Sequence, residues 1–132
     1  MSSADETIRS LREAVRVSPD NTPLRQHLAR TLLGLGRFAE AEIEIRQALA
    51  LAPESQELKI DLANAYFQQE KISQALVVLE DVARRPESPG RAHVLYAYLL
   101  LRTGDVPGAV AQYKLGIETD PDAGDAELAE RL

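Results

Sequence analysis

The residue types that most often carry out chemistry are few in this sequence, and their spacing suits none of the common catalytic or metal sites. The two histidines, His27 and His93, stand alone, without the HExxH pattern or another ligand spacing. Cysteine is absent, which excludes a disulfide and a thiolate metal site. Glu42 and Glu44 form a carboxylate pair, but we expect both on a solvated helix face. The sequence therefore predicts a protein that is not an enzyme and has no metal and no cofactor.

Composition and charge exclude further classes of partner. The chain has 132 residues, 45% hydrophobic and 27% charged, which suits one folded domain. Its net charge of −6 argues against a nucleic-acid partner, which would need a basic face. The first ten residues are polar, unlike a signal peptide, and no run approaches the roughly 20 apolar residues of a membrane span. We therefore expect a cytoplasmic protein that binds neither nucleic acid nor membrane.

One stretch, Arg37–Pro53, has the pattern of a complete amphipathic helix with a defined end. Apolar residues recur along it every three or four positions, polar residues occupy the other side, and Pro53 cannot continue the helix. Altered copies of this stretch occupy Lys71–Glu87 and Asp105–Pro121, 34 and 68 residues further on. Each unit is too small to bury its own apolar face, so neighbouring units must stack.

The sequence resembles the tetratricopeptide repeat family, whose repeat of 34 residues contains two helices. When each unit is numbered from one to 34, alanine occupies positions 8 and 20 of all three units, where a small side chain lets helices approach closely. These alanines are Ala29, Ala63, Ala97, Ala41, Ala75 and Ala109. The pattern is broken at position 27 by Val82 and Gly116, and at position 32 by Glu87, where proline is usual.

The resemblance implies an all-α fold, a right-handed superhelical array of antiparallel helix pairs. The expected fold is a single domain over residues 1–132. The expected parts are an N-terminal capping helix at 3–19, repeats at 22–55, 56–89 and 90–123, and the start of a C-terminal helix at 124–132. These parts amount to seven helices and a short eighth.

Capping patterns predict where three of these helices begin. Ser3 and Glu6 have the spacing of a capping box. Thr22 precedes Pro23, which is favoured at the first position of a helix, and Ser55 precedes the helix after that. We therefore expect Ser3, Thr22 and Ser55 to be the N-caps.

In this family the first helix of each repeat lines a concave groove, so the resemblance makes that groove the candidate binding site. The side chains expected there are Gln26, His27, Arg30 and Leu33 from the first repeat, Ile60, Asp61, Asn64 and Phe67 from the second, and Arg91, Val94, Leu95, Tyr98, Leu101 and Arg102 from the third. The apolar residues in this set indicate a protein contact. The alternative is that the last helix, with Leu128 and Leu132, folds over the third repeat and covers them, and both hold if that helix can be displaced.

The sequence favours a non-enzymatic protein–protein interaction module that binds a peptide or a partner helix in the groove. We expect Asn64 to bond the backbone of the ligand. Phe67 and Tyr98 would supply the buried area that binding hot spots need. Arg30 and Arg102 would pair with acidic groups of the ligand.

One narrower function is disfavoured by the residues themselves. Chaperone-binding members of the family hold a C-terminal carboxylate in a clamp of Lys, Asn, Asn, Lys and Arg. The matching positions here carry Gln26, Arg30, Asp61, Arg91 and Leu95. Only Arg91 keeps the required type of charge, and Asp61 would repel an acidic tail.

The alternative function is self-association, or a role as an assembly or adaptor domain of a larger protein, because a short array exposes apolar end faces. The chain also looks like the N-terminal repeat segments that precede ATPase domains in some bacterial proteins. A homo-oligomer in solution would favour this alternative, and a monomer would favour a free binding groove.

Overall fold

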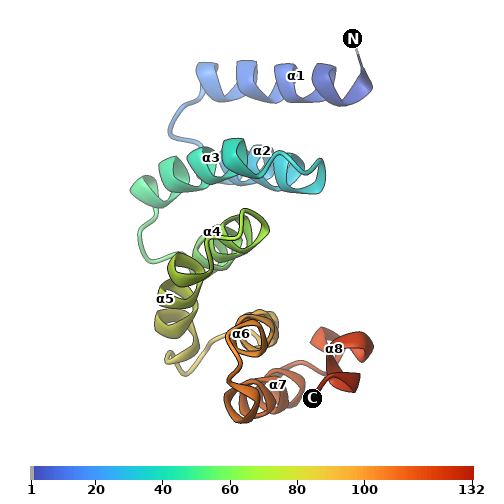
Figure 1. The fold of residues 1–132 in the computed structure, drawn as a ribbon. Helices are drawn as coiled ribbons and strands as arrows, with labels where there is room; N and C mark the ends of the chain where they lie inside the picture. The colour runs from blue at the N-terminus through green and yellow to red at the C-terminus, as the bar shows by residue number, and fades with distance from the viewer. Residues whose placement is uncertain (1) are drawn as a thin grey trace. The chain divides into compact units, whose positions relative to one another are not determined.

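A computed structural model gives the structure of residues 2–132. Within that range the chain forms eight α-helices, one short 3-10 helix and no strand (Figure 1). The predicted all-α fold, with seven helices and a short eighth, is confirmed. No helix among the described residues is long and apolar enough to cross a bilayer. The chain divides into two compact units, one ending at Gln69 and the other beginning at Glu70.

The first unit contains the four helices α1 (Ser3–Val17), α2 (Thr22–Gly34), α3 (Phe38–Leu51) and α4 (Gln56–Gln68). Along the chain each helix packs against the next, most extensively α2 against α3. The buried Val, Leu and Ile side chains of this unit come from all four helices: Ile8, Val15, Leu28, Leu32, Ile45, Leu58, Ile60 and Leu62. All four helices of the unit therefore contribute to its apolar interior.

The second unit contains α5 (Ile72–Ala83), α6 (Gly90–Arg102), α7 (Val106–Thr119), the 3-10 turn η1 (Pro121–Ala123) and α8 (Ala126–Glu130). The helices α6 and α7 form the most extensive pair, and α5 packs against α6. A cluster of Val94, Ala97, Ala109 and Leu128 forms the core of the C-terminal part. The short helix α8 thus contributes a core residue to this unit.

Small residues set the distance between paired helices. All six alanines at positions 8 and 20 of the repeats have no exposed surface. At Gly116 even alanine would be too large, because a Cβ atom there would lie 2.8 Å from Val94 Cγ2 and 3.0 Å from the carbonyl oxygen of Gly90. A Cβ atom on Gly90 would in turn lie 2.6 Å from the carbonyl oxygen of Gly116. The absence of alanine at position 27 of the third repeat is therefore required by a close contact between α6 and α7.

The structure moves two of the three predicted N-caps by one residue. The cap of α1 is Ser2, whose hydroxyl accepts from Asp5 N at 3.1 Å. The cap of α2 is Asn21, whose side chain accepts from Leu24 N at 3.1 Å. Both caps have extended backbone, whereas Ser3 and Thr22 already lie within the helices. The prediction for Ser55 is confirmed, because its hydroxyl accepts from Leu58 N at 3.2 Å.

The turn inside each helix pair has one residue in the left-handed region, always at the same repeat position. The residues are Gly36, Glu70 and Gly104, with φ of 75°, 62° and 88°. Glycine adopts this conformation without steric cost, but a side chain adopts it only against a penalty of about 1–2 kcal/mol. The turn that contains Glu70 is therefore strained where the other two are relaxed.

We predict that Glu70→Gly stabilises the protein by about 1 kcal/mol relative to Glu70→Ala, because alanine keeps the steric penalty of positive φ and glycine removes it. Both substitutions also remove the ion pair from Arg102 Nη2 to Glu70 Oε2, so the comparison cancels that loss. Urea unfolding followed by circular dichroism measures the difference. Equal stability of the two variants would contradict the prediction.

Candidate functional site

The predicted groove residues of the first unit differ widely in exposure. His27 and Arg30 are exposed, and Gln26, Leu33, Asn64 and Phe67 are half-buried. By contrast, Ile60 and Asp61 are only 2% and 5% exposed. These two side chains belong to the interior of the unit and offer a ligand almost no surface.

Arg30, expected to bind an acidic ligand, is held by carboxylates of its own chain. Its Nη2 donates to Glu57 Oε2 at 2.7 Å and its Nε donates to Asp61 Oδ2 at 3.1 Å. Partial burial works against the charged form of Arg30, but these two bonds outweigh it and raise the pKa of the guanidinium. Gln26 Nε2 also donates to Asp61 Oδ2, at 3.5 Å. The polar end of the predicted groove is therefore an ionic contact between α2 and α4.

In the second unit the last helix packs against the third repeat. This is the alternative that the sequence left open beside an uncovered groove. Leu128 of α8 has no exposed surface and packs with Val94 and Ala97, and Tyr98 and Leu101 pack against this cluster. Tyr98 Oη donates to Asp125 Oδ2 at 2.8 Å. Val94 is 8% exposed, so like Ile60 it is an interior residue. Leu95 stays half-buried, whereas Arg91 and Arg102 are exposed, and Arg102 pairs with Glu70.

An apolar residue at position 12 remains partly accessible in every repeat. These residues are Leu33, Phe67 and Leu101, all of intermediate exposure. One turn before Phe67, the half-buried Asn64 accepts from Gln68 Nε2 at 3.4 Å, and its own amide nitrogen donates to no described residue. The face of α4 therefore combines apolar surface with an available hydrogen-bond donor.

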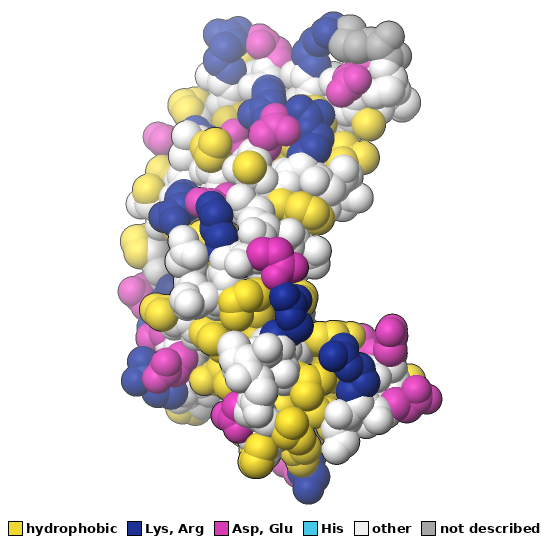
Figure 2. All heavy atoms as spheres, viewed as in Figure 1, with side chains coloured by type: hydrophobic (Ala, Val, Ile, Leu, Met, Phe, Trp, Pro, Cys, Tyr) yellow, Lys and Arg dark blue, Asp and Glu magenta, His cyan; other side chains and the backbone are white. Residues whose placement is uncertain are grey.

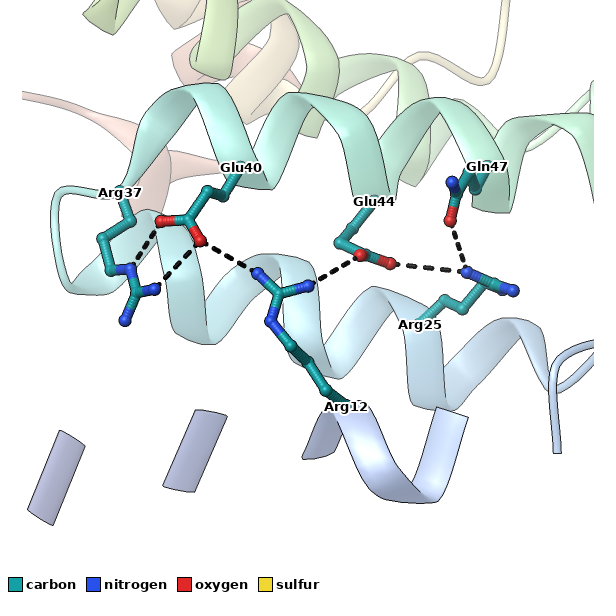
Figure 3. Close-up of polar contacts among 6 residues, drawn as sticks. All are labelled: Arg12, Arg25, Arg37, Glu40, Glu44 and Gln47. Carbon is teal, nitrogen blue, oxygen red and sulfur yellow. Dashed lines mark hydrogen bonds and ion pairs between the residues drawn. The ribbon is translucent and has the colours of Figure 1, made fainter. Parts of the chain in front are cut away.

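A buried carboxylate that sequence reasoning placed on a solvated face is the centre of a charged network in the first unit. Glu44 is 7% exposed, and its two oxygens accept from Arg12 Nη1 at 3.2 Å and from Arg25 Nη1 at 3.4 Å (Figure 3). Arg12 Nη2 also donates to Glu40 Oε1 at 3.0 Å. A hydrogen bond from Arg37, together with the charge of Arg12, lowers the pKa of the Glu40 carboxyl.

This network ties α1 to α3, because Arg12 comes from α1 and both glutamates come from α3 (Figure 3). Beside it lies a hollow of about 370 Å³, with apolar Val15 and Leu28 in its lining and the polar groups of Arg12, Arg25 and Glu44 around it. Charged side chains gather over α1 and α3 in Figure 2, whereas hydrophobic side chains gather over α6 and α7. A signal for Glu44 existed in the sequence, since it follows the buried Ala41 by three residues and precedes the buried Ala48 by four.

The sequence of this chain matches models of a known repeat family. Family models described as tetratricopeptide repeat match residues 2–48 and residues 60–126, and the second match alone spans just over half of the chain. The chain belongs to the tetratricopeptide repeat family. Repeats of this kind build protein-interaction scaffolds, which is the class of function that membership supports. No curated protein matches the chain in sequence.

Several solved structures share this tetratricopeptide repeat fold. A crystal structure of MamA superposes with a TM-score of 0.78 at 18% identity, covering 92% of this chain and 76% of that one. MamA from Desulfovibrio magneticus RS-1 gives 0.78 at 15% identity, covering 92% and 69%. A structure of MamA MSR-1 gives a TM-score of 0.74 at 18% identity, covering 93% of this chain and 71% of that one. Identities this low show a shared fold and not a shared partner.

Among residues 2–132 no group of three or more His, Asp and Glu side chains could hold a metal ion. His93 is buried and its Nδ1 lies 2.7 Å from Gln112 Oε1, so it packs between α6 and α7. His27 is exposed on α2.

We predict that Glu44→Ala lowers the free energy of unfolding by about 1–3 kcal/mol, because it leaves two arginines without a shared acceptor at a mostly buried position. The matched control is Glu13→Ala, which removes an exposed partner of Arg16 on α1 and should cost less than about 1 kcal/mol. Urea unfolding of both variants measures the difference. Equal losses would argue against a special role of Glu44.

The carboxyl of Asp125 should titrate below the ordinary aspartate pKa of about 3.9. The backbone N–H of Leu128, followed by the hydroxyl of Tyr98, donates to this carboxylate and lowers its pKa. Because the folded pKa is lowered, the stabilisation is complete above the ordinary value and is lost as pH falls through the folded one. The amide resonance of Leu128 in NMR spectra should report this titration, and a midpoint above 3.9 would refute it.

Proposed function

We propose that the protein is a protein–protein interaction module that binds an extended peptide or a partner helix along the first helices of its repeats. The observation that supports this proposal most directly is the partly exposed apolar residue at position 12 of each repeat. Partly exposed aromatic and aliphatic groups beside an available donor are the kind of anchor that peptide recognition uses.

The contacts within the chain narrow the binding face. Arg30 already donates to Glu57 and Asp61. Tyr98 donates to Asp125, and Arg102 pairs with Glu70. In the first unit, the partly exposed Leu33, Asn64 and Phe67 are the groups that a ligand would contact. The proposed ligand is therefore a mainly apolar segment whose backbone carbonyl accepts from the Asn64 amide, and not an acidic tail that needs a clamp of cations.

A display selection of random peptides on the intact protein, followed by fluorescence anisotropy, tests this function. We expect selected peptides to lose at least about tenfold in affinity with Phe67→Ala, because truncating an anchor residue costs 1.4 kcal/mol or more. The matched control is Ile43→Ala on α3, which removes a side chain of a residue that is 55% exposed and outside this face. Failure to select any peptide, or an equal effect of both substitutions, would contradict the proposal.

Self-association is a second candidate function, supported by the outer surface of α7. Leu115 on this helix is 45% exposed, so it offers aliphatic surface for a contact with a second copy. A role as the assembly domain of a larger protein would use the same surface. The mass in solution at micromolar concentration tests this candidate, and a monomer that Leu115→Asp leaves unchanged would contradict it.

A further inference from the structure

The hollow beside Glu44 in the first unit has an arginine at its rim with an unused donor. Arg25 of α2 is 15% exposed in its side chain. Its Nη1 donates to Glu44 Oε2 at 3.4 Å and to Gln47 Oε1 at 2.6 Å, and its Nε donates to the carbonyl oxygen of Pro19 at 2.7 Å. Its second terminal nitrogen, Nη2, points away from Glu44 and donates to no described residue (Figure 3). This nitrogen is available to a ligand.

The other polar groups of the rim also leave donors available and acceptors occupied. Gln47 accepts through Oε1, and its amide nitrogen donates to no described residue. Arg16 donates through Nε and Nη2 to Glu13, which lies outside the lining, and its Nη1 has no acceptor among residues 2–132. Both oxygens of Glu44 already accept from arginines. The ligand that complements this rim is therefore one that supplies acceptor oxygens.

Apolar side chains form the rest of the lining. They are Val15 of α1, Leu28 of α2 and Pro19 between the two helices. The volume of about 370 Å³ lies at the lower end of the range of roughly 300–1,000 Å³ that is typical of ligand sites. An apolar lining beneath a rim of donors suits a ligand in which an aliphatic group lies next to a carboxylate.

The charge around the hollow favours an anion, although the whole chain is acidic. Three arginines and one carboxylate line the hollow. Residues 1–50 contain seven arginines and seven carboxylates, so the net charge of −6 arises in residues 51–132. At physiological ionic strength, exposed charges more than about 8 Å apart are largely screened from each other. The arginines of the lining therefore dominate the field that a ligand meets there.

The positive lining continues beyond this hollow along α1. Arg12 and Arg16 also line a second hollow, of about 620 Å³, together with Arg9 and Arg37. Four arginines and two carboxylates line it. Arginine clusters recognise acidic motifs in peptides, because the guanidinium fork matches a carboxylate. Two adjoining hollows that share their arginines fit an extended acidic segment better than a single small anion.

We propose that the hollow beside Glu44 is a second binding site, which takes a short acidic segment of a partner protein with Leu, Ile or Val next to Asp or Glu. The aliphatic side chain enters the hollow against Val15 and Pro19. The carboxylate accepts from Arg25 Nη2 and from Arg16. The site shares none of the residues assigned to the proposed function, so it goes beyond that function and does not depend on it.

Fluorescence anisotropy with one defined probe on the full chain tests the proposal. The probe is the peptide Ser-Leu-Asp-Glu-Leu-Ser with an uncharged dye, blocked at both ends so that the side-chain carboxylates are its only charges. One control peptide carries Asn-Gln in place of Asp-Glu, and the other carries Ser in place of both Leu. We expect each control to bind at least about tenfold more weakly than the probe, because the charge-assisted bonds and the aliphatic burial each contribute that much.

Two substitutions locate the binding. Arg16→Gln should weaken binding of the probe at least about fivefold, because it removes a charged donor of the rim. Its matched control is Arg84→Gln, since Arg16 and Arg84 are 71% and 72% exposed and each pairs with an acidic residue three positions earlier in the chain. Arg25→Lys should also weaken binding several-fold, because it keeps the charge beside Glu44 and loses Nη2.

Equal effects of Arg16→Gln and Arg84→Gln would overturn the proposal. Equal binding of the probe and either control peptide would do the same, as would no binding of the probe at millimolar concentration. A peptide with phosphoserine in place of Asp that binds at least tenfold more tightly than the probe would assign the site to phosphopeptides and overturn the choice of a carboxylate. Phe67→Ala should leave binding of the probe unchanged, so failure here and failure of the proposed function are distinguishable.

Discussion

The structure depends on how closely neighbouring helices can approach. A pair of short helices cannot bury its apolar face alone, so each pair must lie directly against the next. Alanine at positions 8 and 20 makes this possible, and all six of these alanines are fully buried. The close approach also places polar side chains of successive first helices within reach of each other. The contacts from Arg30 to Glu57 and from Tyr98 to Asp125 exist only because of this spacing.

Charge has a structural role at the start of the chain. The helix α1 buries only Ile8 and Val15 completely or almost so, which is little apolar area for a helix of 15 residues. Arg12 adds a bond to Glu44, and that carboxylate is shared with Arg25. A buried carboxylate is tolerated where such partners surround it. The helix α1 is therefore attached by ion pairs as well as by apolar contacts.

The 34-residue period was sufficient to predict the helices, the paired arrangement and the alanines at the contacts, because those features repeat. It could not predict which polar side chains the fold itself would use. Arg30 and Asp61 were placed correctly in the register, yet whether they meet a ligand or each other depends on the distance between α2 and α4. The same limit explains Ile60 and Val94, which the family pattern assigned to the groove and which the structure buries. Whether α8 would cover the third repeat also depended on tertiary contacts, above all on where Leu128 packs.

The contact between Gly90 and Gly116 gives the second unit a mechanical property. At this contact neither glycine has room for a Cβ atom, so the two backbones lie directly against each other and a displacement of one helix here is passed on to the other. The helices α6 and α7 therefore behave as one stiff element. A change of shape in this unit is therefore expected in the elements that pack on this pair, α5 and α8, and not between α6 and α7.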